Sequence, residues 1–209
     1  MSAAPSARSI AARRALAAAD PVLGRHLARV GRYGLVVDRA SSIYQALAEA
    51  VVYQQLTGRA AATIFARVQA LGGGVLPAPA ELLRLPDDAL RGAGLSRAKA
   101  AALQDLAAHA HDGRLPELHE ARGLADDALI ERLCGVRGVG PWTVQMLLIF
   151  RLGRTDVLPA TDYGIRKGFQ RVFRTRALPT PAQILSRGER WRPHRTMAAW
   201  YLWRALDTP

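Results

Sequence analysis

The sequence has a single cysteine, Cys134, among 209 residues. One thiol excludes an internal disulfide, a cysteine-rich zinc finger and a four-cysteine iron–sulfur cluster. We therefore expect a reducing compartment: the cytoplasm with its nucleoid in a bacterium, or the nucleus or an organelle in a eukaryote. No apolar run approaches the ~18 residues that a membrane-spanning helix needs, so no membrane partner is expected.

Lysine is nearly as scarce, because only Lys99 and Lys167 occur among 29 basic residues. Acidic residues number 17, so arginine supplies most of a net charge of +12. Such a charge favours an anionic partner, and the planar guanidinium group suits phosphate. An arginine- and alanine-rich chain can also reflect codon bias, and the charge says nothing about the fold.

Convincing strand patterns are absent too, whereas apolar residues recur at helical spacing along most of the chain. The clearest stretch is residues 42–56, where a capping box of Ser42 and Gln45 precedes apolar positions i, i+3, i+4, i+7 and i+8. Residues 35–37 are the only β-like segment. Further helices are predicted in the first twenty residues, over 59–70, 80–85, 96–111, 126–133, 141–152 and 163–173, from Pro181, and over 193–206.

These patterns predict an all-α protein made of two packed helical lobes. We expect residues 1–39 to form an N-terminal helical extension that packs on the C-terminal lobe, and residues 40–209 to form the main domain. The first twenty residues lack an acid before Asp20, as transit peptides do. The rest of the chain shares their composition, which favours an ordinary amphipathic helix. The five histidines show no metal-ligand spacing, and we expect them on the surface.

The most specific stretch is residues 133–143, Leu-Cys-Gly-Val-Arg-Gly-Val-Gly-Pro-Trp-Thr. It predicts a helix, a glycine turn and a second helix that begins at Pro141. Gly138 and Gly140 allow close backbone approach, and their amides lie at or before a helix N-terminus, where anions bind. A DNA phosphate fits this description, although Gly-x-Gly is also a common tight turn.

An aspartate, Asp162, directly precedes the helix predicted over residues 163–173. Aspartate is a favoured N-cap, so spacing alone favours a capping role.

Taken together, these motifs resemble the helix–hairpin–helix DNA glycosylases, specifically the 3-methyladenine DNA glycosylase II group. The glycine turn is followed, 22 residues after Gly140, by Asp162. The resemblance extends to residues 52–56, 94–99, 189–195 and 198–203 and covers roughly residues 40–206. It implies a helix–hairpin–helix DNA-binding motif, with residues 40–209 as the glycosylase domain.

The resemblance implies a monofunctional DNA glycosylase that excises alkylated bases of the 3-methyladenine and 7-methylguanine type in base excision repair. It makes Asp162 the catalytic carboxylate, which stabilises the oxocarbenium-like sugar or orients water. Bifunctional relatives carry a lysine after the Gly-Pro pair, where this chain has Trp142, so we expect no AP-lyase activity.

The resemblance also implies a base pocket and a DNA-binding set. A damaged base must leave the duplex to be reached, and aromatic faces attract a cationic base. Gln55 and Leu56 match the loop that enters the gap, with Leu56 as the apolar wedge; both also suit an ordinary helix C-terminus. The predicted pocket residues are Trp142, Tyr163, Trp203, Tyr44 and Tyr53. The predicted DNA-binding residues are Gln55, Leu56, Arg137, Gly138, Val139, Gly140, Thr143, Arg166 and Lys167, the last two of which are also ordinary surface charges.

No cofactor is expected beyond a monovalent cation. In relatives the hairpin holds Na⁺ or K⁺ by backbone carbonyls, which here belong to Cys134, Val136 and Val139. Two departures stand out: Arg137 replaces the usual proline, and Met146 replaces a tyrosine found in some members.

The expected partner is double-stranded DNA with damaged bases, bound by a monomer. The alternatives are a non-catalytic helix–hairpin–helix DNA-binding protein, a glycosylase for deaminated bases, and a basic helical adaptor.

Overall fold

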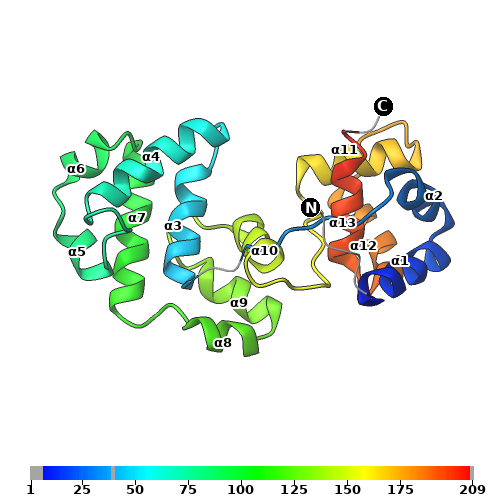
Figure 1. Ribbon diagram of the computed structural model, residues 1–209, viewed down its shortest axis with the longest axis horizontal. Coiled ribbons are helices and arrows are strands. Elements are labelled where there is room, and N and C mark those ends of the chain that lie inside the picture. Colours follow the sequence, from blue (N-terminus) through cyan, green and yellow to red (C-terminus); the bar gives the residue numbers. More distant parts are fainter. Residues whose placement is uncertain (1–6, 39–40, 208–209) are drawn as a thin grey trace. The chain divides into compact units, whose positions relative to one another are not determined.

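The computed structural model describes residues 7–38 and 41–207, which fold into helices and loops (Figure 1). Within these ranges the β-structure is limited to one isolated bridge between Gly72 and Val75. The predicted all-α fold is confirmed. The contacts divide the chain into unit 1, Met1–Asp38 with Leu148–Pro209, and unit 2, Arg39–Leu147. The domain boundary predicted between residues 39 and 40 lies outside the described residues.

Unit 1 joins the N-terminal helices to the C-terminal ones. A core of apolar side chains from α1, α2, α11, α12, the 3₁₀ helix η1, α13 and the loop before α11 holds it together. Trp191 and Tyr201 are the largest fully buried side chains of this core. The elements of unit 1 are α1 (Ala7–Ala19), α2 (Pro21–Val30), α11 (Tyr163–Phe173), α12 (Pro181–Gly188), η1 (Glu189–Trp191) and α13 (Arg195–Arg204).

A buried carboxylate ties three elements of unit 1 together. Asp20, the N-cap of α2, is fully buried and accepts from Leu23 N at 3.3 Å, Arg187 Nε at 2.7 Å and Trp191 Nε1 at 3.1 Å. Burial raises the pKa of Asp20, but these hydrogen bonds lower it by more, so the pKa lies below its usual 3.8. The ionised carboxylate therefore fixes α2 against α12 and η1.

Unit 2 is built around α7, whose buried side chains Leu103, Leu106 and Ala107 share one stripe. This helix contacts α3 and α5, and α3 also contacts α4. Ser96 caps α7 through Lys99 N at 3.3 Å, as predicted. The helices of unit 2 are α3 (Ile43–Tyr53), α4 (Gly58–Ala70), α5 (Pro79–Arg84), α6 (Asp87–Gly92), α7 (Arg97–His111), α8 (Leu118–Gly123) and α9 (Asp126–Leu133). Another helix, α10 (Pro141–Phe150), includes the boundary between the units.

Several sequence predictions need correction. The patterns missed α2, α6 and α8; the last two are too short for a full apolar period. Residues 35–37 form no strand. The helix predicted to reach residue 56 ends at Tyr53, because Gln54 has a non-helical ψ of 132° and Gln55 takes a φ of 57°.

Placing all histidines on the surface was wrong for two of them. His26 is only 3% exposed and His109 only 9%. His26 Nε2 lies 2.8 Å from the Tyr201 carbonyl oxygen, to which it donates, and burial lowers the pKa of this imidazole. His109 pairs with Asp105, and its Nε2 accepts from Arg114 at 2.9 Å. Each buried ring is thus compensated by hydrogen bonds, which composition alone does not reveal.

Candidate active site

The predicted catalytic carboxylate begins α11 in unit 1. Asp162 is the N-cap of this helix, and its Oδ1 accepts from Ile165 N at 2.8 Å. The same oxygen accepts from Trp203 Nε1, on α13, at 2.9 Å. Asp162 is half-buried. Two N–H groups therefore hold this oxygen at the positive end of the helix dipole. Capping and a chemical role are therefore compatible at this position.

The indole that holds Asp162 is itself fixed from both sides. Trp203 stacks on Phe150, with ring centroids 5.8 Å apart and an angle of 29° between the rings. A Cβ added to Gly164 would lie 3.0 Å from Asp162 Oδ1 and 3.0 Å from Trp203 Cδ1. Any side chain at position 164 would push on the bond between the carboxylate and the indole. Phe150 and Gly164 were not predicted, because only tertiary contacts identify them.

Tyr163, the first residue of α11, is 64% exposed, so its ring is open to a ligand. Lys167 Nζ lies 5.8 Å from the centre of that ring. Arg166 instead donates from Nε to the Pro179 carbonyl oxygen at 2.9 Å, which anchors the base of its guanidinium group. Unit 1 therefore brings Asp162, Tyr163 and Trp203 together, with Lys167 beside Tyr163.

In unit 2 a pocket contains two of the predicted aromatic residues, Trp142 and Tyr53. Trp142 follows Pro141 on α10 and is 43% exposed. The pocket has a volume of about 500 Å³ and is lined by Ala50, Tyr53, Gln54, Gln55, Trp142, Thr143 and Met146. Its wall joins the end of α3 to the start of α10. Ring faces and a thioether make it suitable for a flat, polarisable group.

Tyr44 does not line this pocket. Its hydroxyl donates to the Pro77 carbonyl oxygen at 3.1 Å, and burial raises the pKa of this phenol. That bond connects α3 to the loop before α5. Tyr44 and Tyr53 both belong to α3, but only Tyr53 contributes to the pocket.

The glycine turn has the backbone that its sequence predicts. Gly138 has a φ of 77°, and a Cβ there would lie 3.2 Å from Ala102 Cβ on α7. Val139 N donates to the Val136 carbonyl oxygen at 3.0 Å, so this amide closes the turn. Arg137 N donates to Asp105 Oδ2 at 2.7 Å. The hairpin, α9–turn–α10, is thus packed tightly on α7 near its glycines, while the Arg137 side chain is exposed.

The turn after α3 carries the predicted wedge. Gln55 has a positive φ, and Leu56 is 39% exposed. Gln54 Nε2 donates to the Gly138 carbonyl oxygen at 3.0 Å and lies 3.4 Å from Thr143 Oγ1. Thr143 was predicted to bind DNA, and its side chain is buried. Its described partner is Gln54, a residue that was not singled out.

Among the described residues, no group of three or more His, Cys, Asp or Glu side chains is arranged to hold a metal ion. Burial raises the pKa of the Cys134 thiol, which disfavours a thiolate ligand. The carbonyl site of Cys134, Val136 and Val139 depends on backbone oxygens only, and stays a prediction. Within the same ranges no helix is long and apolar enough to cross a bilayer.

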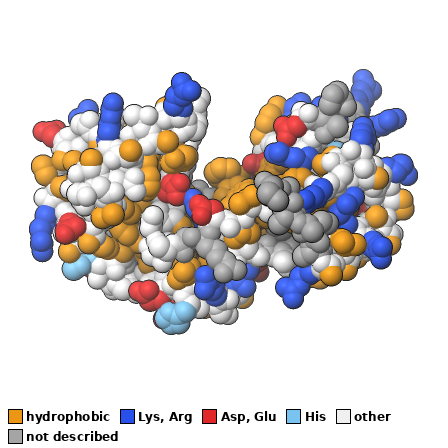
Figure 2. All heavy atoms as spheres, in the orientation of Figure 1, with side chains coloured by type: hydrophobic (Ala, Val, Ile, Leu, Met, Phe, Trp, Pro, Cys, Tyr) orange, Lys and Arg blue, Asp and Glu red, His pale blue; other side chains and the backbone are white. Residues whose placement is uncertain are grey.

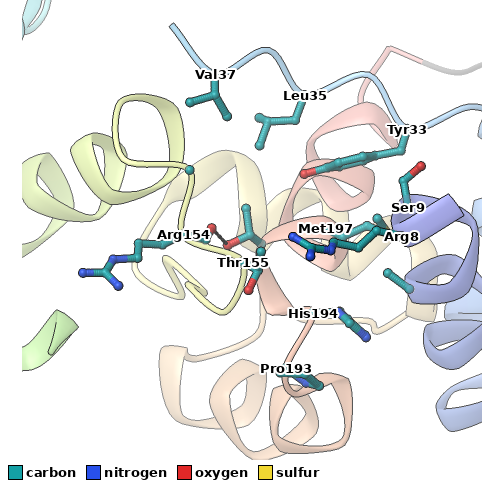
Figure 3. Close-up of a pocket in the computed structure, with 13 residues that line it drawn as sticks. Arg8, Ser9, Tyr33, Leu35, Val37, Arg154, Thr155, Pro193, His194 and Met197 are labelled. Atoms are coloured by element: carbon teal, nitrogen blue, oxygen red, sulfur yellow. Dashed lines mark hydrogen bonds between the residues drawn. The ribbon is translucent and has the colours of Figure 1, made fainter. Parts of the chain in front are cut away.

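Another cavity, of about 450 Å³, lies within unit 1 and contains none of the predicted site residues. Leu35 and Val37 point into it from the coil after α2, above Met197, while the Arg154 side chain points away (Figure 3). Its lining is mostly apolar and offers no carboxylate. It therefore has no place in the predicted chemistry.

The charge is divided unevenly between the two units. By sequence, unit 1 holds 18 Lys and Arg against 6 Asp and Glu, while unit 2 holds 11 of each. The whole net charge of +12 therefore belongs to unit 1. Basic side chains crowd the part of Figure 2 that holds α1, α2 and α11–α13. The unit that contains Asp162 thus carries the positive charge that favours polyanions.

A helix–hairpin–helix in an all-α fold, with a carboxylate 22 residues beyond the second glycine, defines a class of DNA repair protein. The family model for HhH-GPD superfamily base excision DNA repair proteins matches residues 48–193. The chain therefore belongs to this superfamily, and the predicted family is confirmed.

Its relatives include DNA-3-methyladenine glycosylase 1 of Schizosaccharomyces pombe, which is 41% identical over 162 residues, 77% of this chain and 71% of the relative. A solved structure of Schizosaccharomyces pombe 3-methyladenine DNA glycosylase in complex with abasic DNA has a TM-score of 0.84 at 36% identity and covers 95% of this chain and 97% of that one. The crystal structure of a DNA-3-methyladenine glycosidase from Bacillus halodurans has a TM-score of 0.85 at 33% identity and covers 94% of this chain and 89% of that one.

Proposed function

We propose that this protein is a monofunctional DNA glycosylase that excises alkylated bases, of the 3-methyladenine and 7-methylguanine type, in base excision repair. It hydrolyses the N-glycosidic bond of a flipped nucleotide in double-stranded DNA, acts as a monomer, and works in the compartment that holds the DNA. The observation that carries the proposal is the Asp162 carboxylate, held by the α11 N-terminus and the Trp203 indole in a member of the HhH-GPD superfamily.

The carboxylate accounts for the bond cleavage. When the bond between base and sugar breaks, positive charge develops on the sugar, and a preorganised anion stabilises that charge. Asp162 needs no reorganisation, because its Oδ1 is already held by two donors. An N3- or N7-alkylated purine is cationic before it leaves, so the leaving group needs no separate general acid.

The aromatic residues account for the choice of base. Trp142 and Tyr53 line a pocket in which a ring face can stack on a cationic purine, an interaction worth about 0.5–2 kcal/mol. Trp142 also occupies the position where a strand-cutting relative would carry a lysine. Indole forms no Schiff base, so the product is an abasic site in an intact strand.

The hairpin and the arginine-rich unit account for DNA binding. Gly138 and Gly140 precede the N-terminus of α10, where backbone amides suit a phosphate. The +12 of unit 1 adds attraction that does not depend on the base sequence. A monovalent cation on the carbonyls of Cys134, Val136 and Val139 would fix the turn from the other side.

The test incubates the protein with methylated duplex DNA and separates the released bases by chromatography. We expect free 3-methyladenine or 7-methylguanine, with strands that stay intact until alkali is added. Strand cleavage without alkali would contradict the monofunctional assignment. A protein that binds the duplex and releases no base would instead be a non-catalytic DNA-binding protein. A protein that releases only deaminated bases would be a glycosylase for that substrate class.

A further inference from the structure

Residues Gln54–Leu56 form the turn between α3 and α4, the wedge turn. Its backbone conformation depends on contacts with residues outside the turn. Gln55 has a φ of 57°, a left-handed conformation that side chains other than glycine rarely adopt. The turn ends in Leu56, an exposed apolar side chain. Such a backbone persists only where neighbouring groups hold it. The groups that do so belong to α7 and to the hairpin.

The first support is Lys99, in the opening turn of α7. Its Nζ donates to the Val52 carbonyl oxygen at 2.8 Å and to the Gln54 carbonyl oxygen at 2.6 Å. Both oxygens lie at the C-terminal end of α3, where carbonyls lack helical partners and attract a cation. The ammonium group therefore fixes the point at which the chain leaves the helix and enters the wedge turn.

The choice of residue type at position 99 is informative. Only two of the 29 basic residues are lysine, so the chain uses arginine almost everywhere else. An ammonium group is compact and directs three donors in different directions, whereas guanidinium is a flat fork. Two carbonyls at the end of one helix suit the ammonium group. The geometry of these two carbonyl groups thus explains why position 99 has lysine in a chain that otherwise uses arginine.

The second support is the Gln54 side chain. Its Nε2 donates to the Gly138 carbonyl oxygen, within the glycine turn of the hairpin, at 3.0 Å. The same nitrogen lies 3.4 Å from the buried Thr143 hydroxyl on α10. Gln54 is therefore bound on both sides: its backbone oxygen contacts Lys99 and its side chain contacts the hairpin.

We propose that Lys99 and Gln54 are positioning residues that lock the wedge turn to the hairpin, so that phosphate binding by the hairpin sets the position of Leu56 for base extrusion. This inference rests on the proposed function, because extrusion matters only to a protein that acts on a flipped base. Neither residue touches the reacting atoms. Their effect is on the step that opens the base stack.

The experiment compares Lys99→Met, Lys99→Arg and Gln54→Ala with the unmodified protein and with Arg91→Met. The Arg91 variant is the matched control, because it removes one exposed positive charge from α6 in the same unit. Single-turnover release of 7-methylguanine is measured opposite cytosine and opposite thymine. Fluorescence of a 2-aminopurine next to the lesion reports extrusion without bond cleavage, and thermal melting reports folding.

For Lys99→Met and Gln54→Ala we expect excision opposite cytosine to fall about tenfold, because small displacements of positioning groups are costly. Opposite thymine the fall is less than about threefold, because a mispaired base is already partly unstacked. The 2-aminopurine signal falls in parallel, and Arg91→Met behaves as the unmodified protein. Lys99→Arg behaves as Lys99→Met, because charge alone does not replace the ammonium geometry.

Several results would overturn the proposal. The lock is absent if both variants keep the excision rate opposite cytosine, or if the two substrates lose rate by the same factor. A fully active Lys99→Arg would overturn the role given to the ammonium group of Lys99, because a guanidinium group would then hold the wedge turn equally well. The proposed function fails separately: if the unmodified protein raises the 2-aminopurine signal but releases no base, the fluorescence of the variants still decides whether the lock exists.

Discussion

Replacing Asp162 by asparagine separates a capping residue from a catalytic one. Asparagine is as good an N-cap as aspartate, and its amide oxygen can accept from Ile165 N and Trp203 Nε1 as Asp162 Oδ1 does. What disappears is the negative charge. We therefore expect Asp162→Asn to change the free energy of unfolding by less than about 1 kcal/mol, mainly through the helix dipole.

The excision rate should respond very differently. Removing a preorganised group that stabilises transition-state charge costs on the order of 10²–10³ in rate, or about 3–4 kcal/mol of activation free energy. Asp162→Ala should lose the same rate and in addition the cap, which is worth about 1–2 kcal/mol. That loss lowers the melting temperature by roughly 2–8 °C for a chain of this size.

The assay combines single-turnover release of 7-methylguanine with thermal melting and with binding to DNA that contains an abasic site. Both variants should bind this product DNA nearly as well as the unmodified protein. If Asp162→Asn excises the base at the normal rate, Asp162 is a cap and nothing more, and the reasoning is refuted. A loss of rate that follows the melting temperature across the two variants would refute it as well.

Three further predictions concern the wedge residue Leu56, the support of Asp162 and the buried carboxylate Asp20. Leu56→Ala should weaken excision from matched duplexes about tenfold with little change in melting temperature, because the side chain is already 39% exposed; an equal loss of stability would place Leu56 in the core. Gly164→Ala should slow excision without weakening DNA binding, because its Cβ would lie 3.0 Å from both Asp162 Oδ1 and Trp203 Cδ1 and would displace the hydrogen bond between these residues. An excision rate equal to that of the unmodified protein would show that this hydrogen bond is dispensable. Asp20→Asn should cost about 1.5–3 kcal/mol at neutral pH, through weaker bonds to Arg187 and Trp191. Since folding lowers the pKa of Asp20 below 3.8, its contribution is complete above that pH and is lost as the pH falls through the folded-state pKa. Urea unfolding of the unmodified protein and of Asp20→Asn is measured from pH 7 to 3. The difference between their free energies of unfolding should stay constant at first and decrease only below about pH 4. A difference that already decreases near pH 6 would contradict a lowered pKa of Asp20.

The helices that sequence patterns predicted well are those with long apolar stripes and clear caps. Thr180 and Gln183 form the complete capping box expected at the start of α12. Ser42 caps α3 through Gln45 N at 3.1 Å. Caps and stripes depend on residues three or four apart, so local sequence determines them. Short helices such as α6 and α8 carry too little local signal, and their place depends on packing.

The site shows the same division. Sequence alone determined the glycine turn, the absence of a lysine after Pro141, and an aspartate at the start of a helix. Each is a matter of residue type and short spacing. The tertiary structure alone decided that Trp203, 41 residues beyond Asp162, donates to its carboxylate. It also decided that the Gln54 side chain donates to the Gly138 carbonyl oxygen. It decided as well that Tyr53 lines the pocket, whereas Tyr44 donates to Pro77 and does not. These are contacts between distant segments, and no local pattern encodes them.

The distribution of net charge depends on both the sequence and the fold. Composition determined that the chain carries +12, and arginine chemistry pointed to an anionic partner. Only the fold decided where that charge acts, because unit 1 is assembled from both ends of the chain while the middle forms a neutral unit 2. Packing residues 7–38 beside the C-terminal helices gathers the whole excess on the unit that holds Asp162. Residue order already places +8 of this charge within residues 148–209, and the packing of the distant N-terminal helices adds the other +4.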